Sequence, residues 1–158
     1  MQTFLPYPDF AATAAVLDPR RLGKQRVEAL QVLRAMTVPG YGWRHHPVAK
    51  MWAGYAEALV RYGLEICAAW CATGRADTVG ATLTAELGGT PRGQAALRRA
   101  GELPPWLGDE AVHRSHRSAL LRKDPAYYRP RFGDEVPDDL PYVWPVSDRW
   151  REPGGDAG

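Results

Sequence analysis

Apolar residues recur at helical spacing in several stretches of the chain, and the clearest of these begins at Asp18. Asp18-Pro19 joins a good N-cap acceptor to a proline at the first helical position, where its fixed φ and missing N–H do no harm. The pattern predicts a helix over residues 19–36 that stops before the Pro and Gly residues at 39–42. Its apolar face is formed by Leu22, Ala29, Leu30, Leu33 and Met36.

A second apolar series starts after His46-Pro47 and ends at Gly74. Its members are Met51, Trp52, Tyr55, Leu59, Tyr62, Ile66 and Trp70, which from Trp52 onward are three or four positions apart. This spacing predicts one long helix over residues 47–74, which we expect to be the central packing element.

Shorter helices are predicted over residues 77–87, 91–100 and 109–123, with a rigid loop at 102–108. Asp124-Pro125 should end the last of them. We expect residues 1–12 to form a proline-rich arm over the body, and residues 141–145 of the irregular acidic C-terminal part to lie on it. No stretch alternates apolar and polar residues long enough to indicate a sheet. The prediction is an all-α, compact single-domain helical bundle over residues 1–146, followed by a disordered tail at 147–158.

The length and composition add a further expectation. A chain of 158 residues, 45% of them hydrophobic, can bury a core without disulfides or metals. No apolar run approaches the roughly 20 residues that span a bilayer, and the start lacks the features of a secretory signal. We therefore expect a soluble, cytoplasmic monomer with no membrane partner. Cys67 and Cys71 are four positions apart on one predicted helix face, so we expect both to be reduced and buried.

The net charge of +2 hides an uneven distribution. Residues 1–132 hold 18 basic and 11 acidic residues, net +7, whereas residues 133–158 hold 2 and 7, net −5. A basic body suggests an anionic partner such as nucleic acid, and the acidic tail could shield or compete for that basic face.

The first helix also carries candidate chemistry. Arg21, Lys24 and Glu28 lie on the side opposite its apolar face, and Lys24 and Glu28 are four apart, so their side chains can touch. This could be a solvated ion-pair face or part of a site. Arg26 projects near the apolar side, where it needs either a partner or an anion.

Two further segments gather cations and aromatic rings. The connector 40–46 contains two glycines, Arg44, His45 and His46. His46 can simply cap the next helix, and the adjacent histidines make a weak metal site, so none is expected. In the second segment, basic residues are interleaved with tyrosines, a composition that suits phosphates and unstacked bases or, equally, an ordinary exposed basic helix. Its candidates are Arg114, Arg117, Arg122, Lys123, Tyr127 and Tyr128.

Three segments together resemble the pyrimidine-dimer DNA glycosylase family of the phage endonuclease V type, and look closest to an actinobacterial-like branch. They are Leu17-Asp18 with 21–30 (RLGKQRVEAL), Gly40-Tyr41 with His45-His46-Pro47, and 115–128 (SHRSALLRKDPAYY). The resemblance implies an all-α enzyme that binds double-stranded DNA, flips a nucleotide out of the stack and needs no cofactor. It also implies an N-terminal α-amine that attacks the sugar C1′ to form a Schiff base, which gives abasic-site lyase activity.

By the same resemblance, Glu28 is the acid/base residue, and Arg26, with Arg21 and Lys24, provides the phosphate-binding neighbourhood. Ser115, Arg117 and residues 125–128 match the family's C-terminal helix and the aromatic turn after it. The chemistry suits these residue types, because a carboxylate stabilises the cationic sugar and an α-amine, with a pKa ordinarily near 8, is a usable nucleophile.

Two positions depart from the family pattern. Gln2 is too large for removal of the initiator, so the Met1 amine, Lys24 or no amine at all would act as nucleophile. Val27 occupies the place before the glutamate where the family commonly has arginine. The alternatives are therefore a DNA N-glycosylase, a non-catalytic nucleic-acid-binding domain that keeps the fold, or an enzyme acting on a nucleoside or nucleotide. The sequence does not decide between DNA and RNA.

Overall fold

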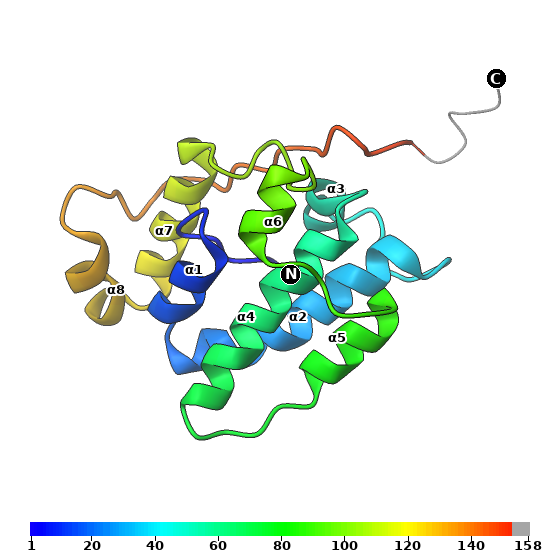
Figure 1. Cartoon of the computed structure of the whole chain (residues 1–158). Coiled ribbons are helices and arrows are strands. Elements are labelled where there is room, and N and C mark those ends of the chain that lie inside the picture. Colours follow the sequence, from blue (N-terminus) through cyan, green and yellow to red (C-terminus); the bar gives the residue numbers. More distant parts are fainter. Residues whose placement is uncertain (153–158) are drawn as a thin grey trace.

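A computed structural model describes residues 1–152, which form eight helices and no strand (Figure 1). The helices are α1 (Phe10–Val16), α2 (Pro19–Thr37), α3 (Pro47–Trp52), α4 (Ala56–Ala72), α5 (Val79–Leu87), α6 (Gln94–Arg99), α7 (Glu110–Lys123) and α8 (Pro125–Phe132). The all-α prediction is confirmed. None of the helices in this part of the chain is long and apolar enough to cross a membrane.

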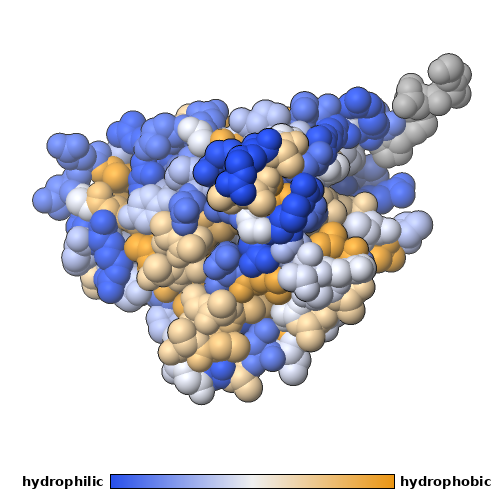
Figure 2. All heavy atoms as spheres, in the orientation of Figure 1, coloured by the Kyte–Doolittle hydropathy of each residue, from blue (hydrophilic) through white to orange (hydrophobic). Residues whose placement is uncertain are grey.

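Helices α2 and α4 pack against each other at the centre, α1 and α5 pack on α4, and α7 and α8 lie together at one side (Figure 1). The core contains the apolar face predicted for α2, with Leu22, Ala29 and Leu33 almost fully buried. On the face drawn in Figure 2, apolar residues gather over the lower part, where α1 and α4 run in Figure 1. A shallow groove of about 470 Å³ lies there, lined mainly by alanines of these two helices.

The helix predicted over residues 47–74 is in fact two helices, α3 and α4, separated by residues 53–55. Gly54 has φ +81°, a left-handed conformation that interrupts a helix and that residues with a Cβ rarely adopt. A Cβ at this position would also lie 2.5 Å from the Cβ of Arg149. The break therefore rests on the glycine itself, and Arg149, 95 positions later in the chain, packs closely against it.

Two helices were not predicted. Within the arm expected over residues 1–12, α1 begins at Phe10, where Asp9 caps it by accepting the Ala12 N–H at 2.8 Å. Pro125 ends α7, as expected, but also starts α8, with Asp124 accepting the Tyr127 N–H at 3.1 Å. An Asp-Pro pair can end one helix and start the next, and both happen here.

The C-terminal strap, defined as residues 133–151, returns from α8 along α7 to α3 (Figure 1). Ser118 Oγ accepts the Leu140 N–H at 3.0 Å, and the Lys50 carbonyl accepts the Ser147 N–H at 2.9 Å. Tyr142, Val143 and Trp144 pack against the core, as expected for residues 141–145. Ser147 is 5% exposed, so the packed chain continues past residue 146, where the tail was expected to begin. The last part of that tail, 153–158, lies outside the described residues.

The two cysteines are free thiols, as predicted, but they differ in burial. Cys67 faces the core, whereas Cys71 is exposed, so the expectation that both are buried is wrong for Cys71. Cys71 lies in the last turn of α4, where the helix extends past the core.

Candidate active site

The first five residues do not lie over the body as an arm but pass through it. Gln2, Thr3, Phe4 and Leu5 are at most 5% exposed. The Phe4 N–H donates to Gln25 Oε1 at 2.9 Å, and the Leu5 N–H donates to Nδ1 of a histidine on α7 at 2.9 Å. Buried backbone groups need such partners, and here side chains of α2 and α7 supply them. The N-terminus is thus held at a fixed place in the fold.

Two buried histidines of α7 hold this segment. His116 Nδ1 accepts the Leu5 N–H, which requires that nitrogen to be unprotonated. His113 Nε2 accepts the Gly108 N–H at 2.9 Å, so its Nδ1 carries the proton and donates to the Leu5 carbonyl at 2.8 Å. Burial lowers the pKa of both imidazoles, that of His116 to about 3. Both rings are therefore neutral structural groups near neutral pH.

Gln25 connects the N-terminal segment to Glu28. Its side chain is buried, and its amide nitrogen donates to the Gln2 carbonyl at 3.0 Å and to Glu28 Oε2. Its oxygen accepts the Phe4 N–H and lies 2.7 Å from the Tyr62 hydroxyl. With all its hydrogen-bonding positions occupied, Gln25 fixes both the first residues of the chain and the carboxylate one turn further along α2.

Glu28 is a partly buried carboxylate surrounded by cations. Burial raises its pKa, and the N-terminal amine, Lys24 and Lys123 lower it, in that order of strength. The amine thus has the strongest influence of these three cations on the carboxylate. The structure brings together the three residues predicted to be catalytic, which are Met1, Lys24 and Glu28, and adds Lys123 from the end of α7.

The charges of the amine and the carboxylate reach two aromatic residues. Burial lowers the pKa of His46 and the N-terminal amine lowers it further, which places His46 on the amine's side of the site. Burial raises the pKa of Tyr142, Arg122 lowers it, and Glu28 raises it, which places Tyr142 on the carboxylate's side. The site is therefore built from the N-terminus, α2, the start of α3, the end of α7 and the C-terminal strap.

Several residues predicted to bind DNA are engaged within the protein instead. Arg26 meets Asp77 at 2.5 Å and lies over the Trp70 ring, on the face of α2 away from Glu28, so its predicted need for a partner is met inside the chain. Arg21 pairs with Asp18 at 3.2 Å. Tyr128 is fully buried, where its hydroxyl accepts the Asp18 N–H and donates to the Asp18 carboxylate.

The basic residues of α7 also have different roles. Arg117 donates to the Pro6 carbonyl at 2.8 Å and pairs with Glu110, and Arg122 donates to strap carbonyls at 2.9 and 3.0 Å. Tyr127 is half-buried, with the Arg131 guanidinium 3.6 Å from its ring centroid. Arg114 is exposed but is half a helical turn around α7 from Lys123. Of the predicted cations on α7, only Lys123 is placed beside Glu28.

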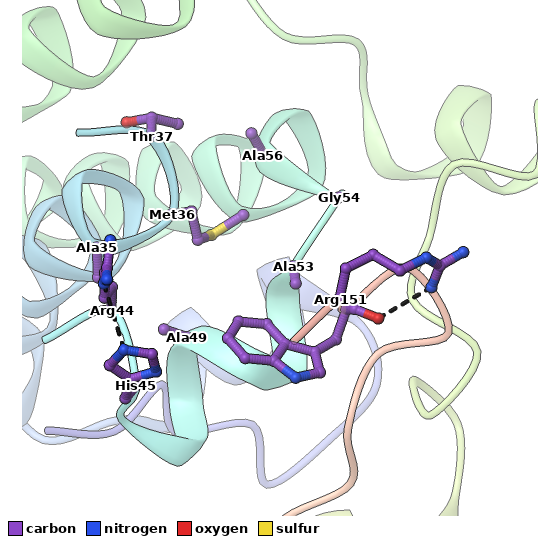
Figure 3. Close-up of a pocket in the computed structure, with 11 residues that line it drawn as sticks. Ala35, Met36, Thr37, Arg44, His45, Ala49, Ala53, Gly54, Ala56 and Arg151 are labelled. Atoms are coloured by element: carbon purple, nitrogen blue, oxygen red, sulfur yellow. Dashed lines mark hydrogen bonds between the residues drawn. The ribbon is translucent and has the colours of Figure 1, made fainter. Parts of the chain in front are cut away.

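Arg44 and His45 lie next to this site but line a separate cavity of about 440 Å³. The cavity lies between the end of α2, α3 and the end of the strap, and its walls include Met36, Trp150 and Arg151. Figure 3 shows Arg44 and His45 on one side and Arg151 on the other, with Arg44 Nε donating to His45 at 3.3 Å. His46 instead caps α3, accepting the Val48 N–H at 3.1 Å, as one interpretation of the sequence expected.

Three residues of the site were not predicted from the sequence, namely Gln25, His116 and Tyr142. A signal existed for Gln25, which is a polar residue three positions before Glu28 and beside the apolar face of α2. Nothing local indicated His116 or Tyr142, because their roles depend on contacts with Leu5 and on the return of the strap. Among residues 1–152, no three His, Cys, Asp or Glu side chains come together as metal ligands would.

Comparison with known proteins finds a matching family. The model of a family described as pyrimidine dimer DNA glycosylase matches residues 1–81, just over half of the chain. The matched part runs from the buried N-terminal segment through Gln25 and Glu28 to the start of α5. No curated protein and no solved structure matches the chain.

Proposed function

The chain belongs to the pyrimidine dimer DNA glycosylase family, and we propose that it removes a damaged or modified base, such as a pyrimidine dimer, from double-stranded DNA. The observation that carries this proposal is the Glu28 carboxylate beside the N-terminal amine. Gln25 donates hydrogen bonds to Glu28 and to the carbonyl of Gln2, the residue that follows Met1, and so holds the carboxylate at the start of the buried N-terminal segment. Such an arrangement lets a nucleophile and an acid/base group reach the same sugar carbon.

In the proposed reaction, the lone pair of the Met1 amine forms a bond to the sugar C1′. The glycosidic bond breaks, and its electron pair leaves with the base, which takes up a proton. Glu28 as a carboxylate stabilises the cationic sugar and receives the proton released by the amine. Opening of the sugar ring at the C1′–O4′ bond, with a proton taken up by O4′, leaves a protonated Schiff base on the amine.

The same intermediate would account for an abasic-site lyase activity. Removal of a proton from C2′ sends its electron pair towards the iminium and expels the 3′ phosphate, and water then releases the enzyme. Lys24 is the alternative nucleophile because it is four residues from Glu28 on α2 and also lowers its pKa. The amine has the stronger influence on Glu28, so we propose Met1.

DNA would be held by the cations around the site rather than by the whole predicted basic set. Lys24 and Lys123, the two lysines that lower the pKa of Glu28, are exposed on α2 and α7, and Arg44 is exposed on the loop before α3. Lysine and arginine side chains bind phosphates on either side of an opened nucleotide without reading sequence. This arrangement supports double-stranded DNA as the partner.

The test is base release from duplexes that each carry one defined lesion, beginning with a cyclobutane pyrimidine dimer, against the undamaged duplex. The proposal predicts release from at least one lesion and none from undamaged DNA. A broad lesion panel with no product, together with tight duplex binding, would instead establish the non-catalytic binding domain.

The exposed acidic residues of the strap should weaken this DNA binding. Arg122 and Arg129 bind strap carbonyls, which holds Asp134, Glu135, Asp138 and Asp139 beside the basic helices α7 and α8. We expect the variant Asp134→Asn, Glu135→Gln, Asp138→Asn and Asp139→Asn to bind undamaged duplex about threefold more tightly at low salt. The gain should disappear as salt is raised.

Fluorescence anisotropy with a labelled duplex over a salt series measures this effect. Truncation after Phe132 is a poorer test, because it also removes Tyr142 and Trp144 from the core. Equal affinities of the two proteins at low salt would show that the acidic residues do not compete for the DNA-binding surface.

A further inference from the structure

The loop before α3 presents an exposed tryptophan from an ordered backbone. Trp43 is 50% exposed, although tryptophan is a large apolar residue. Successive turn hydrogen bonds fix the loop, from the Tyr41 N–H to the Val38 carbonyl at 3.2 Å and from the His46 N–H to the Trp43 carbonyl at 2.9 Å. The indole is therefore held outward by the fold.

Trp43 is also the exposed end of a continuous row of aromatic rings. It meets His46 edge to face at 5.8 Å between centroids, and His46 meets Trp144 at 5.9 Å. Trp144 is 5.2 Å from Tyr142, which meets the buried His116 at 5.8 Å. His116 accepts the Leu5 N–H, and the neighbouring Phe4 N–H donates to Gln25, which holds Glu28, so this row leads from the protein surface to the buried segment that carries the proposed reacting groups.

We propose that Trp43 is a wedge that enters the base stack of duplex DNA where a nucleotide is drawn out towards Glu28. This inference rests on the proposed function, and it assigns to Trp43 a role in positioning the substrate, without contact with the reacting atoms. Arg44 and His45, the next two residues, are exposed and able to bind the flanking phosphates.

The physical argument concerns the gap that an extruded nucleotide leaves. Unstacking a base is unfavourable, and apolar side chains inserted between base steps recover part of that loss. An indole offers a large flat surface to the neighbouring bases. Because the loop already holds Trp43 outward, little conformational freedom is lost when it inserts.

The experiment compares binding to two duplexes of the same sequence. One is intact, and the other carries a single tetrahydrofuran abasic analogue with the fluorescent base 2-aminopurine next to it. This analogue cannot form a Schiff base, so binding is measured without reaction. Wild-type protein should prefer the abasic duplex and quench 2-aminopurine. Trp43→Ala should bind the abasic duplex about tenfold more weakly without quenching, with affinity for the intact duplex unchanged.

Two further variants serve as controls. Trp43→Phe should keep most of the preference and the quenching, because it retains a flat ring. Val38→Ala removes another exposed apolar side chain, 41% exposed, from the same connection and should change neither. Since Trp43 lies outside the core, all three variants should melt as the wild type does.

Equal losses of affinity for abasic, intact and single-stranded DNA in Trp43→Ala would overturn the wedge, as would no loss at all. The outcome can be separated from the proposed function, because base release is measured independently. Base release without a Trp43-dependent preference refutes the wedge alone. A Trp43-dependent preference without base release on any lesion refutes the glycosylase alone.

Discussion

Replacing Glu28 by glutamine is expected to reduce base release at least about 100-fold, the smallest effect usual for loss of a general acid–base group. Glutamine has nearly the same shape and can still accept the hydrogen bond from Gln25, but it cannot take up a proton or stabilise a cationic sugar as a carboxylate does. Single-turnover rates on a lesion-bearing duplex measure the effect. DNA affinity should not fall, because the substitution removes a negative charge.

The same substitution, Glu28→Gln, should make the fold more stable at neutral pH. Burial raises the pKa of Glu28 above its ordinary 4.5, so folding favours the protonated form. The ionised form therefore destabilises the fold as the pH rises through that pKa. Glu28→Gln should unfold at a higher temperature than the wild type at pH 7, and the difference should shrink towards pH 4.

Glu65→Gln provides the matched control, since Glu65 lies on α4 at the alanine-lined groove and pairs with Arg61. It should retain full activity. If Glu28→Gln releases base at the wild-type rate, Glu28 has no role in the chemistry.

Because of His116, acid should begin to destabilise the fold already below pH 6.5. Carboxylates, which titrate near pH 4, would act only at lower pH. The pKa of His116 in the fold is about 3, whereas its ordinary value is 6.5. The stability that this neutral ring contributes is complete above pH 6.5 and is lost as the pH falls towards 3. The loss amounts to about 5 kcal/mol at most, from roughly 1.4 kcal/mol for each of the 3.5 pH units between the two pKa values. Urea unfolding at a series of pH values measures it.

The variant His116→Asn separates this effect from a general loss of packing. The asparagine amide oxygen can still accept the Leu5 N–H, but the amide does not titrate. The unfolding free energy of the variant should therefore fall less steeply than that of the wild type between pH 6.5 and 3. This difference in slope is expected even if the two proteins differ in stability at pH 7. His45→Asn removes an exposed histidine and should leave the slope as in the wild type. An unchanged slope in His116→Asn would show that the ring does not titrate on unfolding.

Local signals in the sequence were sufficient for much of the fold. Asp18-Pro19 started α2 as predicted, and the apolar face of α2 is buried because its spacing matches the helical period. Glu28 and Lys24 could be paired from their spacing alone. The break at Gly54 was not predicted, because an isolated glycine inside a helical pattern is often tolerated, and the close packing of Arg149 against it comes from a distant part of the chain.

The roles of several site residues could not be predicted either, because they also depend on contacts between distant segments. Arg26 was predicted to need either a partner or an anion, and the family resemblance placed it among the phosphate-binding residues, whereas the fold supplies Asp77 as its partner from the segment before α5. Tyr128 looked like a stacking residue but holds α8 to the start of α2 through Asp18. Tyr142 was predicted only to lie on the body within residues 141–145, and the strap brings it against the ring of His116. Sequence patterns identify which residues can do chemistry, whereas contacts between distant segments decide which of them meet.

The most direct test of the central claim is to trap the covalent intermediate and find the amine that carries it. Borohydride delivers hydride to the carbon of a Schiff base and converts it to a stable secondary amine, so an abasic-site duplex treated in this way should become attached to the protein. Peptide mapping by mass spectrometry should place the sugar on the α-amine of Met1 in the wild type, and Glu28→Gln should give little adduct. An adduct on Lys24, or no adduct at all while base release continues, would contradict an N-terminal nucleophile held beside Glu28.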